Sequence, residues 1–498
     1  MTIRRLLIAN RGEIAVRIIR ACREAGVESV AVYSDVDTNA LHVRLADRAV
    51  RIGPAPPSES YLSIPALIAA AQQTRSDAVH PGYGFLSERA AFARACEAAG
   101  VIFVGPPADA IDRMGSKIGA RELMIKAGVP VVPGETPADQ TDAGILADAR
   151  TIGYPVLVKA SAGGGGKGMR LARNDREAAE GIPAARREAT AAFGDGTLYV
   201  ERLIERPRHI EIQVFADAHG NAVHLFEREC SIQRRHQKVV EESPSPAISN
   251  DVRLRMGEAA VAAARAASYR NAGTIEFLVE GDGDAARFYF LEMNTRLQVE
   301  HPVTEAVTGV DLVRAQLTVA EGQRLPWEQR DLRQRGHAIE CRIYAEDPDN
   351  GFLPQAGRLL LYREPQGPGI RVDAGVVEGD SVAVNYDPLL AKLITSGETR
   401  DAAIERMRSA LRAYPILGTR TNIPFLVRLM DHPAFQANRV HTGFLDAHMA
   451  ELADPGDLPT AAIAAAAIDP RPSSDARGTT ADAVPTSDPW TTLSGWGR

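Results

Sequence analysis

The sequence predicts a mixed α/β and α+β protein that begins with a doubly wound parallel sheet. Three observations predict it: strand and helix patterns alternate over residues 1–110, a glycine-rich loop follows an apolar run near residue 160, and a short turn joins two apolar runs that each carry a glutamate. Alternating strands and helices are typical of parallel sheets, whereas strands joined by a tight turn pair antiparallel. We therefore expect a parallel N-terminal layer followed by mixed segments.

The N-terminal pattern starts with the apolar run 6–9, followed by a helical pattern that places Ile14, Ile18 and Cys22 on one face. Gly26 is expected to end this helix, because glycine accepts the left-handed backbone that closes many helices. Residues 29–33, 77–80 and 102–104 read as further strands. Ligands of such sheets bind beyond the carboxyl ends of the strands, and GxGxxG is absent, which argues against a dinucleotide site.

Size, charge and cysteine content narrow the class of protein. The 498 residues suggest about three domains. The net charge of −7 and the scattered basic residues predict neither a nucleic-acid partner nor a membrane-surface partner. We find no signal-peptide pattern and no apolar run of membrane-spanning length. The four cysteines are widely spaced, so we expect reduced thiols in a cytoplasmic protein.

The glycine-rich loop is the first candidate for chemistry. An apolar run ending in Lys159 precedes residues 163–168, which contain five glycines and Lys167. A loop without side chains brings backbone N–H groups close to phosphate oxygens, and the two lysines would add positive charge. Glycines alone would indicate a flexible surface turn, but the preceding lysine favours a phosphate site. The GxxxxGK[ST] order of a Walker A loop is absent.

A pair of glutamates is the second candidate. Glu276 and Glu292 lie in apolar, strand-like runs that are joined by a turn at 281–284. Adjacent antiparallel strands would direct both carboxylates to one point, with Asn294 as a third oxygen donor. Magnesium prefers such oxygen ligands together with substrate phosphates. One glutamate alone would more simply be a solvent-facing strand residue.

The run 296–302 combines Arg296, Gln298 and Glu300. Arginine offers a planar fork for a small carboxylate-like anion such as bicarbonate, and Glu300 would act as a base if its surroundings raise its pKa. A solvated polar loop explains this run alone equally well. The cationic run 229–238 would supply phosphate and bicarbonate contacts, but an exposed basic loop is the simpler interpretation.

Taken together, the motifs resemble the biotin carboxylase family of ATP-grasp enzymes over nearly all of residues 1–447. The matching stretches are IANRGEIAVRIIRAC, HPGYGFLSE, GYPVLVKASAGGGGKGMR, PRHIEIQV, ECSIQRRHQKVVEE, EMNTRLQVEHPVTE, GHAIECRIYAEDP and YDPLLAKLI. The resemblance implies an N-terminal domain at 1–115, an ATP-grasp domain at 116–330 with a mobile lid at about 134–203, and a mixed C-terminal domain at 331–447. The composition of 448–498 predicts a disordered tail or linker.

The resemblance also implies the roles of single residues. ATP would be surrounded by Lys117, Lys159, Gly163, Gly164, Gly165, Gly166, Lys167, Gly168, Met169, Glu201, Ile204, His209, Gln233 and His236. Two Mg²⁺ or Mn²⁺ ions would be bound by Glu276, Glu292 and Asn294. Bicarbonate would be held by Lys238, Arg296, Gln298 and Val299, with Glu300 as the base. Arg342 would stabilise the biotin enolate, and Tyr83 and Asp387 would lie near biotin.

The implied reaction is ATP- and bicarbonate-dependent carboxylation of biotin on a carrier protein, the first half-reaction of an acyl-CoA carboxylase, with a role in fatty acid biosynthesis if acetyl-CoA is the acceptor. Acetyl-, propionyl- and methylcrotonyl-CoA all remain open. No Met-Lys-Met attachment motif occurs, so we expect the biotin carboxyl carrier protein to act in trans or to lie on a missing portion. Carboxyltransferase subunits and a second copy of the chain are the other expected partners. The final DPWTTLSGWGR fits equally a ragged end or a junction to further domains.

Two alternatives remain. Another ATP-grasp ligase, one that activates a carboxylate for attack by an amine, would share the glycine loop and the metal carboxylates. Residues 296–300, together with Arg342 and the domain at 331–447, distinguish the two. A non-catalytic subunit with the same fold would be expected to have lost the catalytic side chains, yet they are all present.

Overall fold

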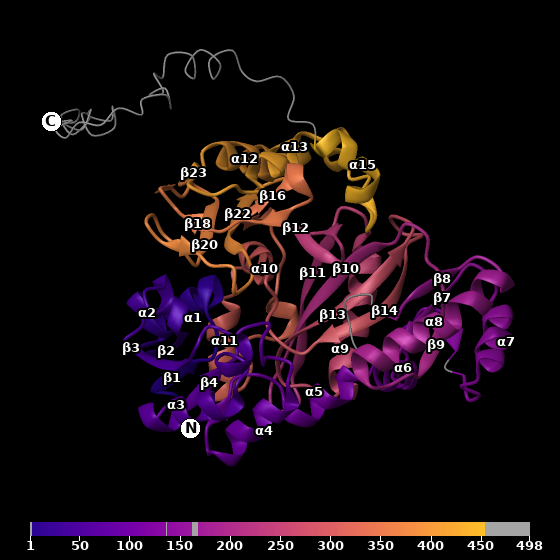
Figure 1. The fold of residues 1–498 in the computed structure, drawn as a ribbon, viewed down its shortest axis with the longest axis horizontal. Coiled ribbons are helices and arrows are strands. Elements are labelled where there is room, and N and C mark those ends of the chain that lie inside the picture. The colour runs from indigo at the N-terminus through magenta and orange to yellow at the C-terminus, as the bar shows by residue number, and fades with distance from the viewer. Residues whose placement is uncertain (1, 136, 162–167, 454–498) are drawn as a thin grey trace, which may run out of the picture. The chain divides into compact units, whose positions relative to one another are not determined.

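The computed structural model describes residues 2–135, 137–161 and 168–453, and Figure 1 shows how the elements are arranged. The predicted N-terminal parallel sheet is confirmed, with the strand order β3-β2-β1-β4-β5. Its strands are β1 (Arg5–Ile8), β2 (Glu28–Ser34), β3 (Arg48–Gly53), β4 (Ala78–His80) and β5 (Ile102–Phe103). Its helices are α1 (Gly12–Ala25), α2 (Leu41–Leu45), α3 (Ile64–Thr74), α4 (Ala90–Ala98) and α5 (Ala108–Gly115). Gly26 closes α1 with a φ of 68°, as its position predicted.

An eight-stranded antiparallel sheet carries the central part of the protein, with the order β14-β13-β10-β11-β12-β15-β22-β20. Its strands are β10 (Arg208–Ala216), β11 (Ala222–Arg234), β12 (Gln237–Ser243), β13 (Asn271–Glu280), β14 (Arg287–Asn294), β15 (His337–Tyr344), β20 (Ile370–Ala374) and β22 (Leu389–Gly397). Strand β12 pairs with β15, so this sheet continues across the boundary expected at residue 330. Side chains from both sides of that boundary therefore share one surface.

A separate four-stranded sheet, ordered β6-β9-β7-β8, occupies the segment expected to form the lid. It contains β6 (Gly134–Glu135), β7 (Val156–Ala160), β8 (Arg170–Ala172) and β9 (Leu198–Arg202), with α7 (Asp142–Ile152) and α8 (Asp175–Phe193). Apolar side chains from these strands and helices form a core of their own. Residues 162–167, which include Gly163, Gly164, Gly165, Gly166 and Lys167, lie outside the described residues.

The remaining elements pack around these sheets, with α9 against β10 and β11, and α12 against β22 (Figure 1). The helices are α6 (Lys117–Lys126), α9 (Asn250–Ala266), α10 (His301–Thr308), α11 (Leu312–Ala320), α12 (Arg400–Arg412), α13 (Ile423–Asp431), α14 (Pro433–Gln436) and α15 (Phe444–Ala453). The short strands are β16 (Glu346–Asp347), β17 (Leu353–Pro354), β18 (Gly357–Arg358), β19 (Leu361–Tyr362), β21 (Ser381–Val382) and β23 (Ile416–Leu417).

The expectation that disorder begins at residue 448 is wrong for the first residues of that segment, because α15 continues to Ala453. Leu452 is buried, and His432 Nε2 lies 2.9 Å from Glu451 Oε2. Packing and a polar contact therefore hold the last turn of the helix. Residues 454–498 lie outside the described residues. Within the described part of the chain, none of the helices has the length and apolarity needed to cross a bilayer.

Candidate active site

One cavity of about 370 Å³ gathers most of the predicted site residues. It is bordered by side chains from the eight-stranded sheet, from the four-stranded sheet and from α6. The predicted residues that line it are Lys117, Lys159, Met169, His209, His236, Lys238, Glu276, Glu292, Asn294, Arg296, Gln298, Val299 and Arg342. Tyr199, Gln237 and Leu291 complete the lining. Residues separated by more than 200 positions in the chain therefore face one space.

Lysines form the end of the cavity that lies on β7 and α6. Lys159, at the end of β7, is buried and donates to Glu201 Oε2 of neighbouring β9 at 2.6 Å. Arg121 lies 3.3 Å from the other oxygen of Glu201. Burial lowers the pKa of Lys117, and nearby Glu292 opposes that shift. Two lysines at one end of a cavity form an electropositive site for a polyanion such as a nucleotide phosphate chain.

The predicted carboxylate pair is confirmed as a cross-strand pair, with Glu276 on β13 directly opposite Glu292 on β14. Glu276 is buried and accepts hydrogen bonds from Lys238 at 2.8 Å and from Asn294 Nδ2 at 2.7 Å. Burial raises the pKa of Glu292, and the neighbouring Glu276 carboxylate raises it further. A divalent cation would relieve that repulsion, so these residues fit the metal ions expected for them.

Lys238 is the centre of charge in the site. It comes from the start of β12, and its Nζ donates to Glu211 at 2.5 Å, to Glu276 at 2.8 Å and to Glu300 at 2.6 Å. Burial disfavours its charge, but the three carboxylates together raise its pKa well above the ordinary value. The ammonium group therefore remains charged and links the carboxylate pair to the predicted base.

Glu300 is fully buried between two cations. Its Oε1 accepts from Lys238, and its Oε2 accepts from Arg342 Nη2 at 3.0 Å. Although burial favours the neutral acid, Lys238, Arg342 and Arg228 hold the pKa of Glu300 well below its ordinary range. The condition stated for Glu300 as a base, that its surroundings raise its pKa, is therefore not met, because the cations outweigh desolvation. Glu300 is thus an ionised acceptor at neutral pH.

Residues 296–300 do not form the solvated polar loop that was the alternative interpretation of this run. Arg296 donates to Gln298 Oε1 at 2.9 Å and to Asn294 Oδ1 at 3.0 Å, and its Nε lies 3.0 Å from Glu88. Gln298 is buried, and Val299 faces the cavity. The run therefore presents a guanidinium group, an amide and a main-chain segment to the same space as Lys238.

The other predicted residues that the structure describes do not line this cavity. Glu201, Ile204, Gln233 and Glu300 are buried, and Gly168 has a φ of 70°. Tyr83 and Asp387 are also absent from its walls. The Tyr83 hydroxyl is buried without a hydrogen-bond partner among the described residues, while Asp387 is exposed and accepts from Leu389 N at 2.8 Å.

Sequence reasoning missed four charged residues that support the site. Glu211 bridges Lys238 and the fully buried Arg228, Glu241 contacts Arg342 at 2.6 Å, and Glu88 pairs with Arg296. Glu211 carried a signal, because it lies two residues after His209 and therefore on the same face of β10. The others join the site only through tertiary packing.

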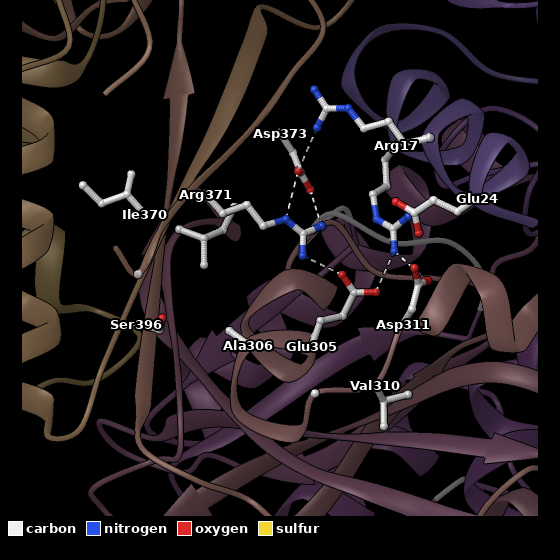
Figure 2. Close-up of a pocket in the computed structure, with 14 residues that line it drawn as sticks. Arg17, Glu24, Glu305, Ala306, Val310, Asp311, Ile370, Arg371, Asp373 and Ser396 are labelled. Atoms are coloured by element: carbon white, nitrogen blue, oxygen red, sulfur yellow. Dashed lines mark hydrogen bonds and ion pairs between the residues drawn. The ribbon is translucent and has the colours of Figure 1, made fainter. Parts of the chain in front are cut away.

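A second and larger cavity, of about 560 Å³, contains none of the predicted residues (Figure 2). Figure 2 shows a chain of ion pairs along it: Arg17 of α1 contacts Glu305 at 2.9 Å and Asp311 at 2.7 Å, and Arg371 of β20 contacts Glu305 at 2.7 Å and Asp373 at 2.8 Å. These pairs tie α1, α10 and β20 together. The central residue of this chain of ion pairs, Glu305, lies on α10, the helix that begins directly after Glu300.

Comparison with known proteins decides the family. The model described as "Biotin carboxylase, N-terminal domain" matches residues 2–111, "Carbamoyl-phosphate synthase L chain, ATP binding domain" matches 116–328, and "Biotin carboxylase C-terminal domain" matches 340–447. The chain belongs to the biotin carboxylase family. As a biotin carboxylase it is an ATP-dependent ligase, and the predicted family is confirmed.

Individual relatives agree with this assignment. The biotin carboxylase of Halalkalibacterium halodurans is 52% identical over 446 residues, which cover 90% of this chain and 98% of the relative. The mitochondrial methylcrotonoyl-CoA carboxylase subunit alpha of Dictyostelium discoideum is also 52% identical, over 91% of this chain, but this chain spans only 64% of that relative's length. The biotin carboxylase domain dimer of Hydrogenobacter thermophilus 2-oxoglutarate carboxylase, solved with MgADP, ADP and bicarbonate, has a TM-score of 0.86 and 45% identity, covering 91% of this chain and 99% of that one.

Proposed function

We propose that this biotin carboxylase uses ATP and bicarbonate to carboxylate biotin on a biotin carboxyl carrier protein, as the first half-reaction of an acyl-CoA carboxylase. The observation that carries the proposal is that Lys238 and Arg342, which line the same cavity as Arg296 and the carboxylate pair, both contact the buried Glu300, which directly follows Val299 of the cavity wall in the chain. The related 2-oxoglutarate carboxylase domain was solved with MgADP and bicarbonate, which are the ligands that this cavity suits.

The nucleotide phosphates fit the lysine end, near Lys117 and Lys159. Glu276, Glu292 and Asn294 would hold Mg²⁺ or Mn²⁺, which supplies positive charge that offsets the phosphate oxygens when bound. His209 Nε2 lies 3.1 Å from Oε2 of Glu276, the oxygen that does not contact Lys238. The lid segment would then exclude water from the reacting phosphoryl group.

Bicarbonate fits beside Arg296, Gln298, Val299 and Lys238. Glu300 accepts its proton, and a bicarbonate oxygen attacks the γ-phosphorus while the bond to the bridging oxygen of ADP breaks. The low pKa of Glu300 keeps this acceptor ionised, and the positive charges of Lys238 and Arg296 would favour loss of the proton from the bound bicarbonate. The product is carboxyphosphate, and Lys238 offsets the charge that develops on the transferred group.

Carboxyphosphate then divides into CO2 and phosphate. Phosphate takes the N1′ proton of biotin, and N1′ attacks CO2 as the charge shifts through the ureido oxygen. Arg342, which reaches the cavity from β15, would stabilise that oxygen. Glu241 orients the guanidinium group by accepting a hydrogen bond from Arg342 Nε at 2.7 Å. Tyr83 and Asp387 remain candidates for contact with the carrier-bound biotin.

The proposal includes three partners: the biotin carboxyl carrier protein, the carboxyltransferase subunits and a second copy of this chain. The dimer in the related 2-oxoglutarate carboxylase structure supports a homodimer, which light scattering of the purified chain would test. One proposed acceptor is acetyl-CoA, in which case the enzyme would act in fatty acid biosynthesis in the cytoplasm. The named methylcrotonoyl-CoA carboxylases support another. Copurified carrier and transferase, supplied with each acyl-CoA in turn, would distinguish them.

The test of the activity itself is ATP turnover by the purified chain with free biotin. ADP release should require bicarbonate and should be accelerated by biotin. Turnover that ignores both would favour the alternative ligase, which activates a different carboxylate, and an amine acceptor would then be sought.

A further inference from the structure

Lys392 is a buried cation that the proposed mechanism leaves without a role. It lies on β22, its side chain has no exposed surface, and it is among the largest fully buried side chains of the described chain. Its neighbour on β15 is Arg342 and its neighbour on β20 is Asp373, because the strands pair in that register. Directly paired residues point to the same face of a sheet, so Lys392 and Arg342 extend side by side toward the active site.

The ammonium group of Lys392 joins three distant parts of the chain. Its Nζ donates to the main-chain oxygen of Val299 at 2.8 Å. It lies 3.3 Å from Glu13 Oε2 at the start of α1 and 3.9 Å from Asp373 Oδ2. Asp373 also binds Arg371 in the ion-pair chain of Figure 2. A buried ammonium group is costly unless it is paired and hydrogen-bonded, so its one directed hydrogen bond indicates what it holds in place.

That hydrogen bond acts on the catalytic segment. The Val299 oxygen belongs to the peptide that leads into Glu300, whose side chain is gripped by Arg342 and Lys238. Neighbouring strands thus hold the side chain of Glu300 and the main chain immediately before it. The preceding peptide is fixed as well, since His301 Nδ1 lies 2.8 Å from Gln298 O. A main-chain shift at Val299 would move both the bicarbonate contacts and the base.

We infer that Lys392 is a positioning residue, which holds the Val299 main chain so that Glu300 and the bicarbonate contacts of residues 298–299 face the phosphoryl group. Glu13 and Asp373 keep its charge balanced. Burial raises the pKa of Glu13 to about 7 and Lys392 opposes that shift, so Glu13 carries only part of the balancing negative charge at neutral pH. The inference rests on the proposed function, because it assigns Lys392 to the bicarbonate step.

The test compares Lys392→Met with the wild-type chain in ATP turnover with free biotin. Loss of one charge-assisted hydrogen bond should raise the KM for bicarbonate, or lower kcat, by about tenfold or more, while the KM for ATP stays within about twofold. A general loosening of the fold would move both KM values together. Arg400→Met is the matched control, since Arg400 is a largely buried cation that pairs with Glu242 away from the cavity, and it should leave the bicarbonate KM unchanged.

Lys392→Met leaves Glu13 without its cation, so the double variant Glu13→Gln/Lys392→Met is measured beside it, with thermal melting as the check on folding. The inference is overturned if the folded variants keep the wild-type bicarbonate KM and kcat, if both KM values rise by the same factor, or if neither variant folds. A wild-type chain without bicarbonate-dependent turnover would instead refute the proposed function. An active wild type with unaffected variants refutes this inference alone.

Discussion

Glu300→Gln is the substitution that separates catalysis from stability most cleanly. It removes the charge that lies 2.6 Å from Lys238 and 3.0 Å from Arg342 but keeps the shape of the side chain. Lys238 retains Glu211 and Glu276, and Arg342 retains Glu241, so neither cation is left unpaired. We therefore expect the variant to fold. Because a positioned base contributes about 10²–10⁴-fold, kcat for bicarbonate-dependent ADP release should fall by at least about 100-fold.

The measurement is steady-state ADP release with saturating ATP, biotin and bicarbonate, together with thermal melting of each variant. Glu242→Gln is the control, because Glu242 is also a buried, ion-paired glutamate of the same sheet but contacts His337 and Arg400. The control should lose stability and keep its turnover. A Glu300→Gln enzyme that retains more than about a third of the wild-type kcat would refute the assignment of the base.

Three further predictions follow from the described contacts. Glu276→Gln combined with Glu292→Gln should raise the Mg²⁺ concentration needed for half-maximal turnover by about tenfold or more; an unchanged requirement would place the metal elsewhere. Lys159→Met should raise the KM for ATP about tenfold and leave that for bicarbonate unchanged, which initial-rate kinetics would show. Although Glu242 is buried, Arg400 and His337 lower its pKa from 4.5 to about 2. The ionised carboxylate therefore stabilises the fold by about 3 kcal/mol above pH 4.5, and this contribution is lost as the pH falls toward 2. The free energies of unfolding in urea of the wild type and of Glu242→Gln should converge over that pH range, and a constant difference between them would contradict the reasoning.

Much of the site followed from local sequence pattern. The apolar runs around Glu276 and Glu292, with their turn, were enough to predict a facing pair, and the pairing register confirms it. The lysine-ended strand at Lys159 was likewise readable, because a strand followed by glycines is a local arrangement. Such features depend on residues that are close in the chain, where backbone geometry leaves few alternatives.

The charge state of Glu300 was not readable in the same way. Lys238 lies 62 positions before Glu300 and Arg342 lies 42 positions after it, and neither spacing indicates contact. The strand pairing of β12 with β15 brings them together, and that pairing crosses an expected domain boundary. The contact between Lys392 and Val299 could not be predicted for the same reason, since only the folded chain brings the two residues together.

The central claim is that bicarbonate, held beside Glu300, is the nucleophile that attacks the terminal phosphoryl group of ATP. Turnover of ATP in the presence of biotin and ¹⁸O-labelled bicarbonate tests this directly, with mass analysis of the released phosphate. The account predicts transfer of one labelled oxygen into each phosphate formed. Phosphate whose one newly acquired oxygen comes from water would contradict it.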